Sequence, residues 1–189
     1  MGNDIDKGAL AAFSKKFKGT TTSPGDGSYD EERSIFNAMI DRKPALIAKA
    51  TDADDVAAVI ALARDAGIPL TVRSGGHSVA GMSIADGAIM LDTRAINTVT
   101  VDPDKRVALV GGGAVWGEVD AATAAHGLVT TGGRVSTTGV AGLTLGGGSG
   151  WAERKYGLAC DRLLSVDIVT ADGSKLHASP KENPDLFWA

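Results

Sequence analysis

The segment ALIAKATDADDVAAVIALARDAGIPLTVRSGGHS, residues 45–78, decides the fold of this 189-residue chain. It predicts a short apolar strand at 45–48, a helix with one apolar face that ends at Gly67, and a second strand at 68–72. A strand, helix and strand in this order pair their strands in parallel. The loop at 73–78 therefore leaves the carboxyl end of a parallel strand, where open α/β sheets bind ligands.

This loop combines two glycines with a histidine. Gly75 and Gly76 allow the backbone to approach a ligand closely and to turn its N–H groups toward an anion such as a diphosphate. His77 adds an imidazole with an ordinary pKa of about 6.5, whose neutral form has a lone pair for nucleophilic attack. A buried structural histidine in a turn is the alternative, and the loop alone does not decide between the two.

The second half of the chain predicts antiparallel hairpins and helices. Strands are expected at 98–101 and 106–110, around a turn of Asp, Pro and Lys residues, and again at 165–170 and 175–178 around an Asp-Gly turn. A helix is expected at 116–126, ended by a glycine. A βαβ lobe followed by hairpins and helices gives an α+β fold.

Composition excludes several classes of protein. The chain is 43% hydrophobic and 22% charged, which is typical of a globular protein, and its net charge of −4 without a basic run argues against nucleic-acid binding. One cysteine, Cys160, is expected to be a buried thiol, and three scattered histidines show no metal-ligand spacing. No signal-like or 18-residue apolar segment is found, so no membrane association and a cytoplasmic location are expected.

More than half of the 25 glycines lie between Gly111 and Gly157. Their neighbours are apolar, so the segment is not a flexible linker, and backbone packed against a ligand is expected. A core in which glycines only relieve crowding is the alternative. Gly148-Ser149-Gly150 lacks the third glycine of a dinucleotide fingerprint, and no P-loop lysine follows a glycine pair.

Five motifs in register resemble one known family. The chain from about Pro44 onward is similar to the FAD-binding part of berberine-bridge-enzyme-like and 6-hydroxynicotine-oxidase-like flavoproteins. The resemblance implies a PCMH-type FAD-binding domain with two lobes. The motifs that carry it are Arg73-Ser74-Gly75-Gly76-His77-Ser78, Gly146-Gly147-Gly148-Ser149-Gly150, Arg154-Lys155-Tyr156-Gly157-Leu158-Ala159, Asp167-Ile168-Val169-Thr170-Ala171-Asp172-Gly173 and Asn183-Pro184-Asp185-Leu186-Phe187-Trp188-Ala189.

The same resemblance implies a cofactor site. His77 stands where this family bonds the 8α-methyl carbon of the flavin to histidine. Val135 stands where many members have a second, cysteinyl bond, so a single bond is expected, and Ser149 stands where some members have a catalytic tyrosine, so no catalytic base is assigned. The residues expected to bind FAD are Arg73, Ser74, Gly75, Gly76, His77, Ser78, Val79, Thr138, Gly139, Gly142, Gly146, Gly147, Gly148, Gly150, Leu158, Val166 and Ile168.

The expected organisation is a polar lead-in at 1–30 without elements at its Thr-rich end, a first α/β lobe at 31–98 and a truncated second lobe at 99–189. The family would continue into a substrate domain, so a fragment that lacks most substrate contacts is expected, and a short form whose missing half comes from a partner chain is the alternative. Self-association of the isolated chain is expected in either case. The resemblance implies an FAD-dependent oxidase of an alcohol or amine, with a small-molecule substrate and O₂ as partners. A noncovalent nucleotide-binding or structural module without turnover is the alternative.

Overall fold

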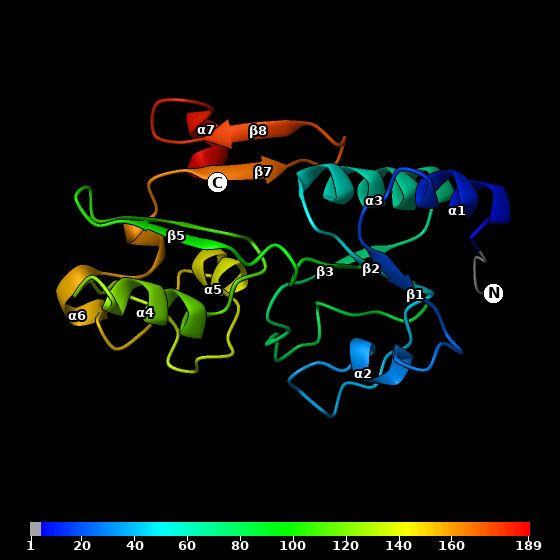
Figure 1. Ribbon diagram of the computed structural model, residues 1–189, viewed down its shortest axis with the longest axis horizontal. Coiled ribbons are helices and arrows are strands. Elements are labelled where there is room, and N and C mark those ends of the chain that lie inside the picture. Colours follow the sequence, from blue (N-terminus) through cyan, green and yellow to red (C-terminus); the bar gives the residue numbers. More distant parts are fainter. Residues whose placement is uncertain (1–4) are drawn as a thin grey trace. The chain divides into compact units, whose positions relative to one another are not determined.

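The computed structural model describes residues 5–189 and divides into two compact units (Figure 1). The first unit comprises the chain up to Arg73, together with Ser78–Asp92 and Leu164–Ala189. The second comprises Ser74–His77 and Thr93–Leu163. The fold is α+β, with both parallel and antiparallel strands, as the sequence predicts.

A four-stranded sheet forms the centre of the first unit. Its strands are β1 (Thr20–Thr22), β2 (Leu46–Lys49), β3 (Leu70–Arg73) and β4 (Ile89–Asp92), in the order β1-β2-β4-β3. The predicted strands β2 and β3 are parallel, but both pair with β4, which lies between them. All four residues of β4 are buried, as expected for a central strand with covered faces.

The lead-in was predicted to lack elements at its Thr-rich end, and this prediction is wrong. Thr20–Thr22 pairs antiparallel with β2 and extends the sheet. The helix α1 (Lys7–Ser14) packs against α3 (Ala53–Ala66). The pairing depends on a partner about 25 residues away in the sequence, which local turn propensity cannot reveal.

The helix α3 begins and ends as helix-capping chemistry dictates. Asp52 is its N-cap and accepts a hydrogen bond from the backbone N–H of Asp55 at 2.9 Å. Gly67 ends it in the left-handed conformation, with φ of 63°. The buried residues of α3 include Val59 and Leu62, and the helix contacts both α1 and β4. The predicted end of this helix is confirmed.

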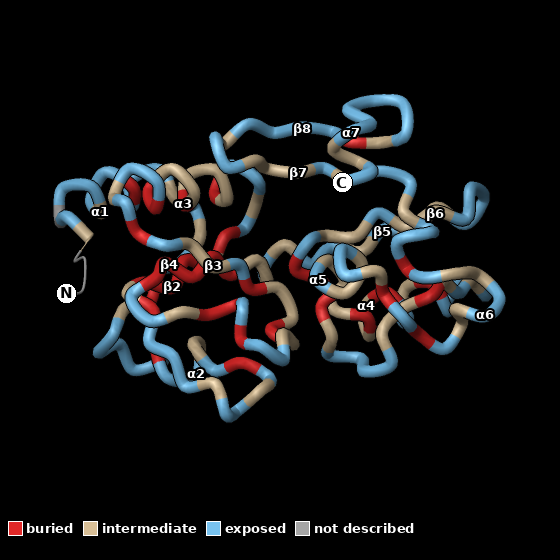
Figure 2. The backbone as a smooth tube through the Cα atoms, turned by 180° about the vertical axis from the view of Figure 1, so that it is seen from behind, coloured by how far each residue is buried: buried red, intermediate tan, exposed pale blue. Residues whose placement is uncertain are grey.

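The opposite side of the sheet carries a second hydrophobic cluster. Tyr29 of α2 (Tyr29–Arg33) is buried there, and its hydroxyl donates to the carbonyl oxygen of Pro44 at 2.7 Å. Ile47, Ile84 and Met90 are buried in the same cluster. Figure 2 shows the buried residues of this unit concentrated around β2 and β4.

The C-terminal hairpin belongs to the first unit. Strands β7 (Val166–Val169) and β8 (Lys175–Ala178) pair antiparallel as predicted, and α7 (Pro184–Phe187) follows them. The hairpin contacts α3, and Lys175 forms an ion pair with Asp54. The hairpin was assigned to the second lobe from sequence, whereas its contacts group it with the first unit.

The second unit is built on the other predicted hairpin. Strands β5 (Val99–Asp102) and β6 (Val107–Val110) pair antiparallel, and α4 (Trp116–Ala124) packs against them. Trp116 and Val119 are buried in this core. Figure 2 shows buried stretches of chain around α4. Its remaining elements are the short helices α5 (Val140–Leu145), α6 (Glu153–Tyr156) and the 3-10 helix η1 (Cys160–Arg162).

Cys160 is exposed, so the expectation of a buried thiol is wrong. Within the segment that leads into η1, Ala159 is the residue that enters the core beside Trp116 and Val119. The single turn of η1 then carries Cys160 to the surface.

Candidate functional site

The loop Ser74–His77 packs in the second unit against the segment that precedes α5. A Cβ atom on Gly75 would lie 2.2 Å from the backbone nitrogen of Gly139, and a Cβ on Gly139 would lie 2.5 Å from the backbone nitrogen of Gly75. Two backbones in such contact leave no room for side chains at either position. The sequence predicted that the backbone at Gly75 approaches a ligand closely. In the structure it closely approaches the backbone at Gly139.

Gly76 sets the direction of the loop. It is buried and has φ of 70°, in the left-handed region that glycine adopts without strain. The histidine that follows it turns back toward the hydroxyl residues before α5.

His77 is held by two threonines. Its Nε2 lies 2.9 Å from Oγ1 of Thr137, and its Nδ1 lies 3.5 Å from Oγ1 of Thr138. The ring is half-buried, and burial lowers the pKa of His77 below 6.5 because it disfavours the charged imidazolium. The imidazole is thus neutral at pH 7, which is the state that a nucleophile requires.

Thr137 is a site residue that sequence reasoning missed. Only Thr138 and Gly139 were predicted from this stretch. The run Ser136-Thr137-Thr138 directly before a glycine was the available signal, because three adjacent hydroxyls offer hydrogen bonds to whatever the glycine admits.

The hydroxyl of Ser74 indicates that this loop can bind a polar ligand. The Oγ atom of Ser74 is buried and has no hydrogen-bond partner among the described residues. A Cβ on Gly139 would lie 2.7 Å from this oxygen, so the hydroxyl lies where the two backbones meet. A buried hydroxyl without a partner is costly, and an anionic or amide group of a ligand would satisfy it. The residues present therefore fit the predicted nucleotide cofactor.

The glycines of the predicted flavin-binding run fall into two groups. A Cβ on Gly150 would lie 1.8 Å from the carbonyl oxygen of Gly132, and one on Gly148 would lie 2.5 Å from Cβ of Ala159. The packing of this chain thus explains both. Gly142 has nothing within 4 Å of its Cβ position, and Gly146 has only ordinary contacts at 3.5 Å. A contact with a cofactor stays a prediction for all of them.

A polar cluster surrounds Ser149. Its hydroxyl donates to Glu153 at 2.5 Å and lies 3.1 Å from the guanidinium of Arg134. Hydrogen bonds from Ser149 and from the Gly150 backbone lower the pKa of Glu153. Arg134 also lies over the ring of Trp151, 5.4 Å from its centre. Glu153 is therefore ionised at neutral pH and pairs with Arg134.

The structure does not bring all predicted site residues into one unit. Arg73 lies in the first unit, buried, and donates to the carbonyl oxygen of Glu32. Ser78 accepts from the backbone N–H of Met82 at 3.0 Å, and the side chain of Val79 is exposed. The other predicted residues of the first unit are Val166 and Ile168, both in β7.

Leu158 lies in the second unit with the glycine run. Its side chain is 39% exposed, and its backbone N–H donates to Asp161 at 2.7 Å. Gly147 adopts φ of 98°, which a side chain would strain. A contact of either residue with a cofactor stays a prediction.

Three other polar side chains, those of His177, Tyr156 and His126, lie outside the loop at His77. His177 is exposed and pairs with Asp167 at 2.7 Å, and this hydrogen bond raises the pKa of His177 above 6.5. Tyr156 is half-buried, with the cationic groups of Lys155 and Arg162 over its ring. His126 is exposed just past the end of α4.

Residues 5–189 contain neither a cluster of metal ligands nor a membrane-spanning helix. No group of three or more histidine, cysteine, aspartate or glutamate residues in this range could hold a metal ion. Among the helices of the same range, none has the length and apolar character needed to cross a membrane.

Comparison with known proteins places this arrangement in a family. A sequence profile for the FAD binding domain matches residues 44–179. (R)-6-hydroxynicotine oxidase of Paenarthrobacter nicotinovorans is 38% identical over 172 residues, which cover 91% of this chain and 38% of the relative. Xylooligosaccharide oxidase of Thermothelomyces thermophilus is 33% identical, over 97% of this chain and 37% of the relative.

Solved structures agree. The crystal structure of 6-hydroxy-D-nicotine oxidase from Arthrobacter nicotinovorans superposes with a TM-score of 0.90 at 38% identity, over 92% of this chain and 38% of that one. Glucooligosaccharide oxidase from Acremonium strictum, described with a 6-S-cysteinyl, 8α-N1-histidyl FAD, gives 0.85 at 33% identity, over 98% and 38%. The chain thus spans less than half the length of these relatives. It belongs to the FAD-binding domain family of FAD-linked oxidoreductases, with a PCMH-type fold and FAD as cofactor.

Proposed function

We propose that this chain is the part of an oxidase that binds FAD and holds it covalently through His77. The observation that carries the proposal is the state of His77: a half-buried, neutral imidazole fixed by a threonine in a loop whose glycines exclude side chains. The histidyl linkage described for glucooligosaccharide oxidase, a relative with the same fold, supports it.

The contact between His77 and Thr137 favours one of the two ring nitrogens of His77 as the atom that attacks the flavin. When Nε2–H donates to Oγ1 of Thr137, the lone pair of the neutral ring is on Nδ1, whose contact with Thr138 is long at 3.5 Å. We therefore assign Nδ1 of His77 as the nucleophile. Nδ1 of His77 would form the bond to the 8α carbon only after that carbon has lost one proton to solvent. The bound FAD would gain two electrons in this reaction and would return them to dioxygen, which would leave as hydrogen peroxide.

FAD, when bound, accepts two electrons from a substrate and passes them to an acceptor. For this protein we propose an alcohol or amine as substrate and O₂ as acceptor, because relatives include oxidases named for hydroxynicotine and for oligosaccharides. Val135, 49% exposed, supplies no thiol, so a single covalent bond is proposed. Most substrate contacts, in our proposal, come from the additional length that the relatives possess.

Covalent attachment is expected to depend on pH through His77. Burial lowers its pKa below 6.5, so the imidazole keeps its lone pair through neutral pH and loses it only when the pH falls through this lowered value. Purified chain is incubated with FAD from about pH 5 to about pH 8, and the flavin that survives acid precipitation is followed with time. The rate should be close to its maximum at neutral pH and should fall with a midpoint below pH 6.5. A midpoint above 6.5 would contradict a neutral, buried His77.

Thr137→Val is expected to slow attachment by about fivefold without changing noncovalent FAD affinity, since valine keeps the shape but loses the hydrogen bond, which is worth about 1 kcal/mol. Thr100→Val, on the exposed face of β5, is the matched control. The rate constant of attachment and the dissociation constant for FAD are measured separately. An equal loss in both would indicate that Thr137 only supports the fold.

Incubation of the chain with FAD also distinguishes a covalent flavoprotein from a noncovalent nucleotide-binding module. Flavin that binds the chain but leaves it entirely on denaturation, at every pH, would favour the noncovalent module. A chain that neither binds nor retains FAD would remove the proposed function from this chain altogether.

A further inference from the structure

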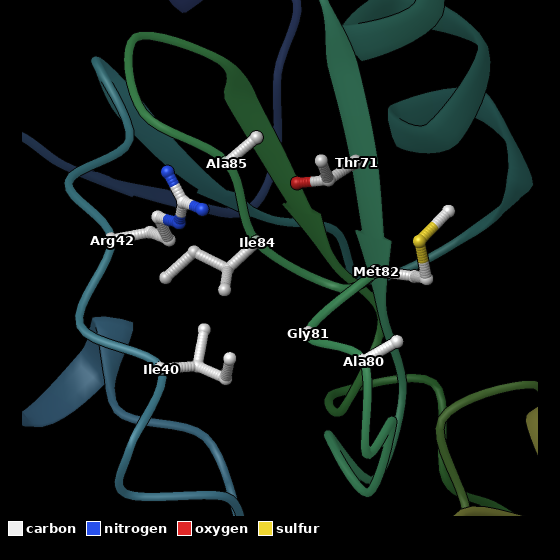
Figure 3. A pocket seen from close by; sticks show the side chains of 8 residues that line it. All are labelled: Ile40, Arg42, Thr71, Ala80, Gly81, Met82, Ile84 and Ala85. Atoms are coloured by element: carbon white, nitrogen blue, oxygen red, sulfur yellow. The ribbon is translucent and has the colours of Figure 1, made fainter.

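A cavity of about 370 Å³ lies in the first unit, beside the edge strand β3. It falls in the size range of small-molecule pockets, about 300–1,000 Å³. None of the residues predicted to bind FAD lines it. The lining side chains, shown in Figure 3, are Ile40, Arg42, Thr71, Ala80, Gly81, Met82, Ile84 and Ala85.

The cavity continues the hydrophobic cluster of the sheet. Thr71 pairs in register with the buried Met90, at the edge of the sheet. Ile84, 4% exposed, is shared between the cluster and the cavity wall. Ile40 packs against the same cluster from the other side of the cavity. The result is an apolar chamber whose inner end is a threonine.

Two tight contacts hold the walls in place. Gly81 has φ of 73°, and a Cβ there would lie 2.8 Å from Cγ2 of Ile40. The side-chain amide of Asn37 donates to the carbonyl oxygen of Val79 at 2.9 Å. The loops that carry Ile40 and Met82 therefore lie in close contact, and one hydrogen bond joins them.

Two polar side chains, those of Thr71 and Arg42, line the cavity. The hydroxyl of Thr71 is buried and makes no hydrogen bond within the described part of the chain. Figure 3 shows this hydroxyl directed toward the side from which Arg42 projects. Because the hydroxyl is closed off from bulk water, only a group that enters the cavity can supply its partner.

Arg42 provides the second polar group. Its guanidinium forms an ion pair with Asp86 at 2.8 Å, and Asp86 in turn accepts from the backbone N–H of Lys43 at 2.7 Å. A guanidinium has five N–H donors, so the pair with Asp86 leaves donors for a carboxylate at the cavity.

We propose that this cavity binds a small amphipathic carboxylic acid whose hydrocarbon body separates the carboxylate from a hydroxyl group. The carboxylate pairs with Arg42, the body lies against Ile40 and Ile84, and the hydroxyl bonds to Thr71. This site does not depend on FAD or on His77.

The probe is 4-hydroxybenzoate, with benzoate as the matched molecule that lacks the hydroxyl. A molecule of about ten heavy atoms is expected to bind with a Kd of about 1 mM. Titrations are followed by amide NMR shifts of the full chain. Shifts should be saturable, should centre on residues 80–85, and should show about fivefold tighter binding of 4-hydroxybenzoate than of benzoate.

Three variants test the assignment. Thr71→Val should remove the preference for 4-hydroxybenzoate and leave benzoate binding unchanged, and it should fold, because it removes only an unpartnered hydroxyl. Arg42→Gln should weaken both molecules about fivefold. Ala80→Leu, at an exposed lining position, should block both. No saturation by about 20 mM, a preference that survives in Thr71→Val, or shifts away from the cavity would each overturn the proposal.

Discussion

Replacement of His77 by alanine is expected to abolish acid-stable flavin completely. Alanine has no lone pair to form the bond, and the adjacent Thr137 hydroxyl has an ordinary, far weaker nucleophilicity without a base. After incubation with FAD, the denatured wild-type chain should carry the mass of one FAD, and the His77→Ala chain none. Mass spectrometry of the intact protein measures this directly.

The control for this variant is His126→Ala. His126 is an exposed histidine of the same unit, just past the end of α4, so its removal changes the histidine count without touching the loop. It should retain full flavin attachment. Peptide mapping of the wild-type adduct must locate the bond at His77. The exposed thiol of Cys160 is the other available nucleophile, and an adduct there would disprove the assignment.

The second large effect is expected at Gly150. A Cβ at this position would lie 1.8 Å from the carbonyl oxygen of Gly132, and neither backbone can move without disturbing the unit. Gly150→Ala should therefore lower the free energy of unfolding by about 3 kcal/mol or more, and lose FAD binding as a consequence of misfolding. Urea unfolding of the flavin-free chain measures the first effect.

Gly142→Ala separates packing from cofactor contact. Nothing lies within 4 Å of its Cβ position, and Gly142 is in the interior of α5, so alanine should raise the free energy of unfolding by about 0.5–1 kcal/mol. If flavin covers this position as predicted, FAD affinity should fall while stability rises. Gly112→Ala, also without atoms within 4 Å, should leave FAD affinity unchanged. Unchanged affinity in Gly142→Ala would remove Gly142 from the site.

Gly150 and Gly142 show what a glycine in the sequence can and cannot predict about its surroundings. Both glycines were predicted to contact the cofactor. In the structure Gly150 is required by Gly132, which lies 18 residues earlier, whereas Gly142 has no neighbour that requires it. A glycine in a sequence indicates that a side chain is excluded or unnecessary, but only the coordinates identify the atom that excludes it.

Local interactions account for what the sequence by itself determined. The end of α3 at Gly67, the β5–β6 and β7–β8 hairpins and the glycine-histidine loop follow from left-handed glycine, turn chemistry and strand alternation, which act within a few residues. The family resemblance, confirmed over residues 44–179, extended these elements to a cofactor and a fold.

Tertiary structure alone decided the rest. The insertion of β4 between β2 and β3, the pairing of Thr20–Thr22 with β2 and the contact of the C-terminal hairpin with α3 join segments far apart in the sequence, and no local propensity encodes the partner. The same holds for His77. Its nucleophilic character was visible in the sequence, but the burial that keeps it neutral and the Thr137 hydroxyl that orients it come from a segment 60 residues away.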